Sequence, residues 1–173
     1  MTRKAVVIDT NVLLVAEGLS GFSRPCQAKC GSLLRTVQRE QIVVLDTGRE
    51  IMTEYGKKLA DRKGQPGLGY EFWKWLLNTR ISHASCETVG LTPHSVRKYK
   101  EFPEHAGLTE FDDSDRKFVA VAAAHPRSPE IVQAGDSKWW GWRNPLAECG
   151  IHLNMPCAAE LQAKWESKIG RHA

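Results

Sequence analysis

Three short runs of apolar residues constrain the fold of this chain most, because each run is continuous rather than alternating. They lie at Lys4–Ile8, at Gln41–Asp46 ("QIVVLD") and at Glu130–Asp136 ("EIVQAGD"). Continuous apolar strands are typical of parallel sheets that are buried on both faces, whereas a strand with one solvated face alternates. Helical patterns fill the segments between the runs. The sequence therefore predicts an α/β fold with a mainly parallel central sheet covered on both faces by helices.

The remaining elements follow from apolar spacing, capping residues and turn residues. Helices are predicted at residues 11–17, 25–39, 47–62, 70–80, 93–102, 115–125 and 158–168. Thr47 is expected to cap its helix together with Glu50, three residues further on. Short strands are predicted near residues 86–91 and 150–156, and a loop at residues 63–69.

The size and composition of the chain fit one folded domain, residues 1–173. Hydrophobic residues make up 42% and charged residues 25%, which argues for a packed core and against disorder. The net charge of +4 is compatible with a polyanionic partner without requiring one. No apolar run approaches the roughly 20 residues that span a bilayer, and Asp9 and Asn11 interrupt the N-terminal apolar stretch. We expect a cytoplasmic protein without membrane association.

The five cysteines are expected to be free thiols in a reducing compartment. They are Cys26, Cys30, Cys86, Cys149 and Cys157. Their odd number and wide spacing argue against a disulfide framework in a chain of this size. A structural zinc site is the alternative, because Cys26 and Cys30 lie one helical turn apart. It is disfavoured, since closer pairs and a histidine contribution are missing.

Three aspartates are predicted to meet at one edge of the sheet. Asp9 ends the first strand and Asp136 ends the third, and the carboxyl ends of parallel strands lie together. Asp115 begins the helix that leads into the third strand, and a right-handed connection brings that helix N-terminus to the same edge. Glu50 and Glu54, one turn apart on the helix after the second strand, are both candidates for a fourth acid.

Clustered carboxylates need a cation or raised pKa values, because each close pair repels by roughly 4 kcal/mol at an effective dielectric constant near 20. A set of oxygen ligands without histidine or cysteine suits Mg²⁺ or Mn²⁺. Thr10 and Asn11, which follow Asp9, and Ser137, which follows Asp136, are candidates to orient the acids. The simpler alternative is that Asp9 and Asp115 only cap the helices that follow them.

The four acidic motifs together resemble those of the PIN domain ribonucleases. "VVIDTNVLL" is similar to the first motif, an apolar strand followed by Asp, Thr or Ser, and Asn. "EIMTEYGKKL" resembles the second and selects Glu54. "DRKFVAVAAA" resembles the third, with alanines at positions 120 and 122, and "IVQAGDSKW" resembles the fourth, which ends at Asp136. The order and approximate spacing of the motifs are kept over most of the chain.

The resemblance implies a PIN-like three-layer α/β/α fold and a metal-dependent endoribonuclease. Asp9, Glu54, Asp115 and Asp136 would be its catalytic, metal-holding residues, with Mg²⁺ or Mn²⁺ as cofactor and RNA as substrate. One role that it allows is the toxin of a toxin–antitoxin pair, with an antitoxin protein as partner; a homodimer is a further partnership left open. An RNA-processing or defence enzyme is the other role.

The chain departs from the family pattern around the fourth motif. Ala134 stands where many members have threonine, and Ser137 and Lys138 stand where some have a further acid. Asp112 and Asp113 could supply a compensating ligand, although solvated loop acids are the favoured interpretation. These departures support an alternative function, a catalytically weakened PIN-like module that binds RNA or protein. A phosphatase with an aspartate nucleophile is disfavoured, because Asn11 occupies the place of its second acid.

Basic and aromatic residues interleave directly after Asp136, in "SKWWGWRN". Lys138, Trp139, Trp140 and Arg143 are candidate RNA-binding residues, since rings stack on unpaired bases and cations neutralise phosphates. One of these tryptophans is expected in the core instead. Trp73 and Trp75 are expected to pack in the core or in a dimer interface.

Overall fold

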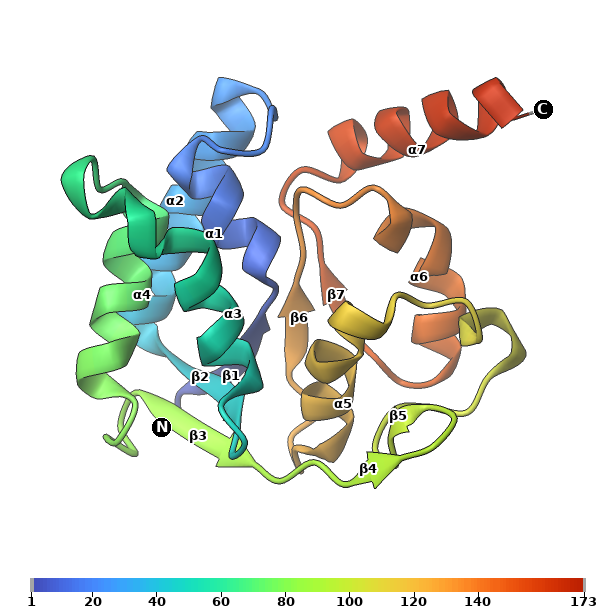
Figure 1. The fold of residues 1–173 in the computed structure, drawn as a ribbon, viewed down its shortest axis with the longest axis horizontal. Coiled ribbons are helices and arrows are strands. Elements are labelled where there is room, and N and C mark those ends of the chain that lie inside the picture. Colours follow the sequence, from blue (N-terminus) through green and yellow to red (C-terminus); the bar gives the residue numbers. More distant parts are fainter. Residues whose placement is uncertain (1, 173) are drawn as a thin grey trace.

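A five-stranded parallel sheet forms the centre of the protein in this computed structural model, which describes residues 2–172 (Figure 1). The strands are β1 (Lys4–Ile8), β2 (Gln41–Asp46), β3 (Cys86–Val89), β6 (Glu130–Val132) and β7 (Leu153–Asn154). Their order across the sheet is β3-β2-β1-β6-β7, and every neighbouring pair is parallel. The predicted α/β class with a parallel sheet is confirmed.

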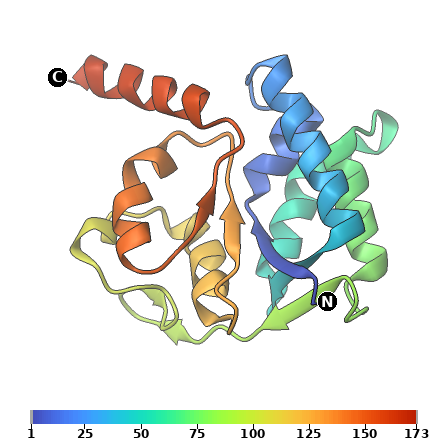
Figure 2. The ribbon, with the colours of Figure 1, turned by 180° about the vertical axis from the view of Figure 1, so that it is seen from behind.

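Helices cover both faces of this sheet. They are α1 (Thr10–Glu17), α2 (Arg24–Glu40), α3 (Glu50–Leu59), α4 (Leu68–Thr79), α5 (Arg116–Ala124), α6 (Lys138–Glu148) and α7 (Ala158–His172), with short 3-10 helices at Ala60–Gly64, Ala106–Leu108 and Asp113–Asp115. Helix α5 packs on one face, in front of the strands in Figure 1, and α2 packs on the opposite face, as the reverse view in Figure 2 shows. The result is a three-layer α/β/α arrangement.

The core lies where the sequence predicted it, around the continuous apolar strands. Residues 5–8 of β1 and residues 42–46 of β2 are buried, as the central position of these strands requires. On α5, the segment from Phe118 to Ala122 is buried as well, so the alanine-rich helix lies close to the sheet. These contacts make β1 a rigid mount for the residue that follows it, Asp9.

The order of the strands reverses between β1 and β6. From β1 the chain builds outward through β2 to β3, and it later returns to add β6 and then β7 on the other side. In open α/β sheets, ligands bind at such a switch point, outside the carboxyl ends of the strands. Ile8 pairs with Val132 at the ends of the two strands. Asp9 and the segment that carries Asp136 therefore leave the sheet at this point.

Three local predictions are wrong. The segment predicted as a helix at residues 93–102 contains a small hairpin instead, β4 (Pro93–His94) with β5 (Lys98–Tyr99). The His94 ring accepts backbone N–H groups of its turn, and the backbone of Lys98 is in the left-handed conformation. Helix α3 begins at Glu50, and the Asp46 carboxylate, rather than Thr47, accepts its first N–H groups. The third strand ends at Val132, four residues before Asp136, whereas the prediction carried it to the aspartate. Helix α6 was not predicted.

The cysteines differ from expectation in one respect. Cys26, in the first turn of α2, and Cys157, just before α7, form a disulfide across 131 residues of sequence. Cys30, Cys86 and Cys149 are free thiols, as predicted. Among the described residues, no helix combines the length and the hydrophobicity needed to cross a membrane.

Candidate functional site

Asp9 stands at the end of β1 and is completely buried. Its Oδ2 accepts the backbone N–H of Asn11 at 3.0 Å, so the aspartate does cap α1, as the simpler alternative proposed. Its Oδ1, however, has no hydrogen-bond partner among the described residues. A buried oxygen without a partner is costly, and a capping role does not explain it. This orphaned oxygen is the first sign that the carboxylate serves a ligand.

Asp115 lies at the end of a 3-10 turn, directly before α5, and is 9% exposed. It makes no side-chain cap to that helix. Its Oδ2 instead accepts the indole N–H of Trp139 at 3.2 Å. The capping alternative is therefore wrong for Asp115, and a buried tryptophan from α6 holds its carboxylate.

Asp112 and Asp136 complete a group of three acids with Asp115. One carboxylate oxygen of each lies within 4.8 Å of the others, a spacing that a single cation can bridge. Asp112 also pairs with the Lys138 ammonium at 2.9 Å, and Asp136 accepts the Lys138 backbone N–H. Asp112 thus belongs to the site, contrary to its interpretation as a solvated loop acid.

The neighbouring Asp113 behaves as a loop acid. Its side chain is 82% exposed and pairs with Arg116. The two adjacent aspartates therefore have separate roles, which their sequence positions alone did not distinguish.

Glu54, and not Glu50, joins the site from α3. Its Oε2 accepts the Thr10 hydroxyl, and its Oε1 lies 3.3 Å from the Lys117 ammonium. Glu50 instead accepts the hydroxyl of Tyr99 at 2.6 Å. Of the two candidates for the fourth acid, Glu54 is therefore the one that lies at the site. Thr10 is the residue that orients it.

Burial and the neighbouring carboxylates raise the pKa values of Asp9 and Asp115. Burial holds the pKa of Asp9 well above its usual range, the negative charges of Asp115, Glu54 and Asp136 add to this, and the Asn11 N–H opposes it. Burial likewise raises the pKa of Asp115 to about 6, the Trp139 N–H opposes this, and Asp136 and Glu54 raise it further. Asp9, Glu54, Asp115 and Asp136 thus lie within electrostatic reach of one another. A divalent cation would relieve both the repulsion and the burial of charge.

The Ser137 side chain contacts α7 and not the acids of the site. It is buried, and its hydroxyl accepts a hydrogen bond from Lys168 of α7 at 2.8 Å. Ala134, the departure at the fourth motif, is completely buried. Of the three predicted orienting residues, Thr10 and Asn11 hold acids of the site, whereas Ser137 contacts α7.

The aromatic segment after Asp136 divides between core and surface. Trp139 is completely buried, so the prediction that it binds RNA is wrong, and the expectation that one of these tryptophans lies in the core is confirmed. Trp140 is half-buried under the Arg143 guanidinium, whose carbon lies 4.0 Å from the ring centroid. Lys138 is exposed beside Asp112. All three residues remain available for a ligand, and Lys138 lies next to the carboxylates.

Sequence reasoning missed Lys117 and gave Trp139 a different role in the site. Lys117 is buried against Glu54, and Trp139 supplies the hydrogen bond to Asp115. Both contacts depend on how α3, α5 and α6 meet, so no local pattern marks them. The only sequence signal is position, since Lys117 follows Asp115 by two residues and Trp139 follows Asp136 by three.

The raised pKa of Asp115 predicts how the cation-free protein responds to pH. A carboxyl group with a pKa of 3.8 in the unfolded chain and of about 6 in the folded protein keeps its proton up to a higher pH in the folded state. The contribution of Asp115 to the free energy of unfolding should therefore fall by about 3 kcal/mol as pH rises from about 4 to 6. Urea midpoints between pH 4 and 7, in chelator, measure this loss.

Asp115→Asn supplies the control for the pH experiment. The asparagine can still accept the Trp139 N–H but does not titrate, so the variant should lose less stability than the wild type over the same pH range. Adding Mn²⁺ to the wild type at pH 7 should restore stability. Equal pH slopes for both proteins would contradict the assignment.

Comparison of the chain with protein-family models, with curated proteins and with solved structures found no match. The fold class and the geometry of the site are therefore the basis for any function. Because one fold hosts many activities, the function is inferred from the chemistry of the site.

Proposed function

We propose that the protein is a metal-dependent endoribonuclease of the PIN type, with Asp9, Glu54, Asp115 and Asp136 as its catalytic centre. The observation that carries this proposal is the buried Asp9, whose Oδ1 has no hydrogen-bond partner among the described residues and whose neighbours are three further acids. The position at the switch point of the sheet supports it.

The donor set fits Mg²⁺ or Mn²⁺, because it consists of carboxylate oxygens. Asp115 and Asp136 would hold the ion together with Asp9, and Asp112 offers a further oxygen close to both. When bound, such an ion supplies Lewis-acid chemistry for the hydrolysis of a phosphodiester.

The residues around the acids fix their orientations before any ligand arrives. The Asn11 N–H holds one oxygen of Asp9, the Thr10 hydroxyl holds Glu54, and the Trp139 indole holds Asp115. Carboxylates held in this way need little rearrangement when charge develops on a phosphate. This preorganisation favours a catalytic role over a merely structural one.

RNA is the proposed substrate because a cationic side chain adjoins the acids and a cation–aromatic pair follows it on the same helix. Lys138 is exposed next to Asp112, and Arg143 stacks on the half-buried Trp140. Such groups neutralise phosphates and stack on unpaired bases, which favours single-stranded RNA.

Cleavage of end-labelled oligonucleotides tests this proposal. The purified protein is expected to cut single-stranded RNA with Mn²⁺ or Mg²⁺, and not with a chelator or in buffer without divalent ions. A matched single-stranded DNA should be cut more slowly. Equal cleavage of both would replace the ribonuclease with a general nuclease, and no cation-dependent cleavage of any RNA would contradict the enzyme.

A second candidate function is a PIN-like module that binds RNA or protein without cutting. The observation that favours it is the pairing of two ammonium groups with acids of the site, Lys117 with Glu54 and Lys138 with Asp112. These lysines neutralise part of the negative charge that would otherwise attract a cation. Binding of RNA that is independent of divalent ions, without cleavage, would support this function.

The toxin role is a further proposal and has a separate test. As a toxin, the protein would arrest growth when produced in a bacterial host, and Asp9→Asn would abolish the arrest. Normal growth despite active enzyme would favour an RNA-processing or defence role instead, and would argue against an antitoxin partner.

Replacing Trp139 by phenylalanine is expected to weaken the use of the cation. The ring remains in the core, but the N–H that holds Asp115 is lost, and such supporting contacts are typically worth about 10- to 100-fold in metal affinity. The concentration of Mn²⁺ for half-maximal cleavage should rise by about 10-fold or more.

Trp140→Phe is the matched control for this variant. Trp140 makes no hydrogen bond to the acids and stacks with Arg143. This substitution should leave the Mn²⁺ requirement unchanged and affect RNA affinity. If Trp139→Phe has a wild-type Mn²⁺ requirement, the hydrogen bond to Asp115 has no part in holding the ion.

A further inference from the structure

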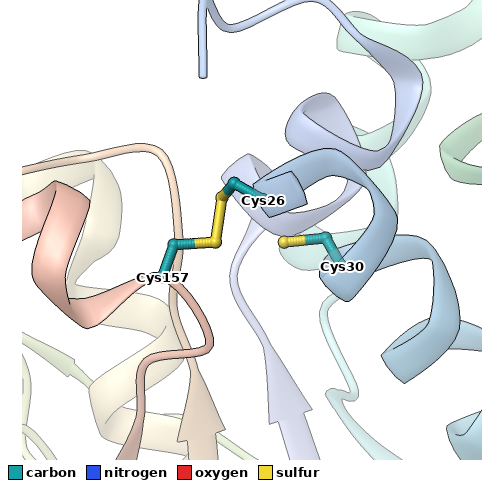
Figure 3. Close-up of side chains that lie close together, drawn as sticks. All are labelled: Cys26, Cys30 and Cys157. Carbon is teal, nitrogen blue, oxygen red and sulfur yellow. A yellow bond between two sulfur atoms is a disulfide. The ribbon is translucent and has the colours of Figure 1, made fainter. Parts of the chain in front are cut away.

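Three cysteine side chains meet between α2 and the residue that precedes α7 (Figure 3). The sulfur atoms of Cys26, Cys30 and Cys157 lie within 4.8 Å of one another, and the residues are 3%, 0% and 5% exposed. The disulfide uses two of these sulfurs and leaves the Cys30 thiol beside it. We propose that the reduced chain binds a soft divalent cation of the zinc type through all three thiolates.

The spacing of the sulfur atoms fits such an ion. Zinc–sulfur bonds of about 2.3 Å in a tetrahedral arrangement place neighbouring sulfurs about 3.8 Å apart. Sulfurs that already lie within 4.8 Å of one another need only small side-chain movements to reach this geometry. A disulfide alone accounts for Cys26 and Cys157, whereas a metal site accounts for the third sulfur as well.

A separate contact keeps the two segments together when the disulfide is reduced. Glu160, in the first turn of α7, accepts the Ser23 backbone N–H at 2.9 Å and the Ser23 hydroxyl at 2.8 Å. Ser23 is the cap of α2, three residues before Cys26. This contact holds the start of α7 against the start of α2 independently of any sulfur chemistry. The three thiols therefore stay close enough to act together.

The location of Cys26 favours the negative charge of the site. Three thiolates and one divalent ion carry a net charge of −1, and Cys26 lies in the first turn of a 17-residue helix. The N-terminus of a helix stabilises negative charge, including thiolate. No fourth histidine, cysteine or acid joins the group among the described residues, so the fourth position falls to water or a small ligand.

Metal binding and the disulfide exclude each other. A dithiol reductant gives two electrons and two protons to the Cys26–Cys157 bond, which becomes two thiols while the reductant becomes a disulfide. Each thiol that then ligates the ion releases its proton. Sulfur ligands select soft ions, whereas the carboxylate centre selects Mg²⁺ or Mn²⁺, so the two sites do not compete for the same metal.

Cobalt titration tests the proposal, because Co²⁺ substitutes for zinc and absorbs strongly only when thiolates ligate it. The titration uses the anaerobic, phosphine-reduced protein with Asp9→Asn, which weakens cation binding at the carboxylate centre. The expected result is one Co²⁺ per chain with thiolate-to-cobalt charge-transfer absorption, which added Zn²⁺ abolishes. The oxidised protein should show no such absorption until it is reduced.

Cys30→Ser is the decisive variant, and Cys149→Ser is its control. Because Cys30 is outside the disulfide, its variant should keep the Cys26–Cys157 bond and stay folded when oxidised, yet lose the charge-transfer absorption when reduced. Cys149→Ser should keep the disulfide when oxidised and the charge-transfer absorption when reduced.

Charge-transfer absorption of wild-type strength in Cys30→Ser, or none in the reduced wild type, would overturn the proposal. RNA cleavage by the carboxylate centre is measured independently, so failure of this site and failure of the proposed ribonuclease are distinguishable.

Discussion

Replacing Asp9 by asparagine is expected to reduce divalent-cation-dependent cleavage of RNA by at least about 10³-fold. The substitution removes the charged oxygen that the site leaves unpaired, and the stabilisation that a bound cation gives a reacting phosphate is worth several kcal/mol. The rate of cleavage of one labelled RNA at saturating Mn²⁺, compared between variant and wild type, measures the loss.

The same substitution should not unfold the protein. Asparagine can accept the Asn11 N–H as aspartate does, and both residues cap helices well. It also removes a buried charge that its neighbours repel. In chelator, the variant is therefore expected to be at least as stable as the wild type. Loss of activity together with retained stability is the signature of a catalytic carboxylate.

Asp113→Asn is the control for the Asp9 variant, since it makes the same chemical change one residue from Asp112. Asp113 is largely exposed and pairs with Arg116, outside the acidic group. Its variant should cleave RNA at close to the wild-type rate. If Asp9→Asn retains cleavage within about ten-fold of the wild type, the buried carboxylate is not part of the catalytic centre.

The sheet and the main acids were predictable because they depend on local patterns joined by general topology. Continuous apolar runs gave β1 and β2 with the bounds that the structure has. Parallel strands and the helix that leads into β6 then bring Asp9, Asp115 and Asp136 to one edge. No contact between distant side chains was needed for that step.

The remaining features depend on tertiary contacts that no short pattern contains. Whether Asp112 or Asp113 joins the site depends on where Lys138 of α6 lies. The hairpin at residues 93–102 has helical sequence features, but turn contacts of the His94 ring outweigh them. Glu17 ends its helix as predicted, but its sequence position did not show that its buried carboxylate accepts the Gly67 N–H before α4. Such partners are distant in sequence and emerge only in the folded chain.

Removing the disulfide is expected to have the largest effect on stability. Cys26 and Cys157 are 131 residues apart, and a cross-link of this length lowers the entropy of the unfolded chain by an amount worth about 5 kcal/mol. Typical domains have a total stability of about 5–15 kcal/mol, so Cys157→Ala should lower the denaturation midpoint strongly. Denaturation of the oxidised proteins, with chelator present, gives the difference.

Three comparisons separate the cross-link from other effects of the substitution. Cys26→Ala, Cys157→Ala and the double variant should lose similar stability, because each removes the same bond and the losses are not additive. A dithiol should destabilise the wild type and leave these variants unchanged. Cys149→Ala, which alters a free thiol, should respond to the dithiol as the wild type does. Additive losses in the double variant would mean that packing of the two side chains, rather than the bond between them, joins α2 to the start of α7.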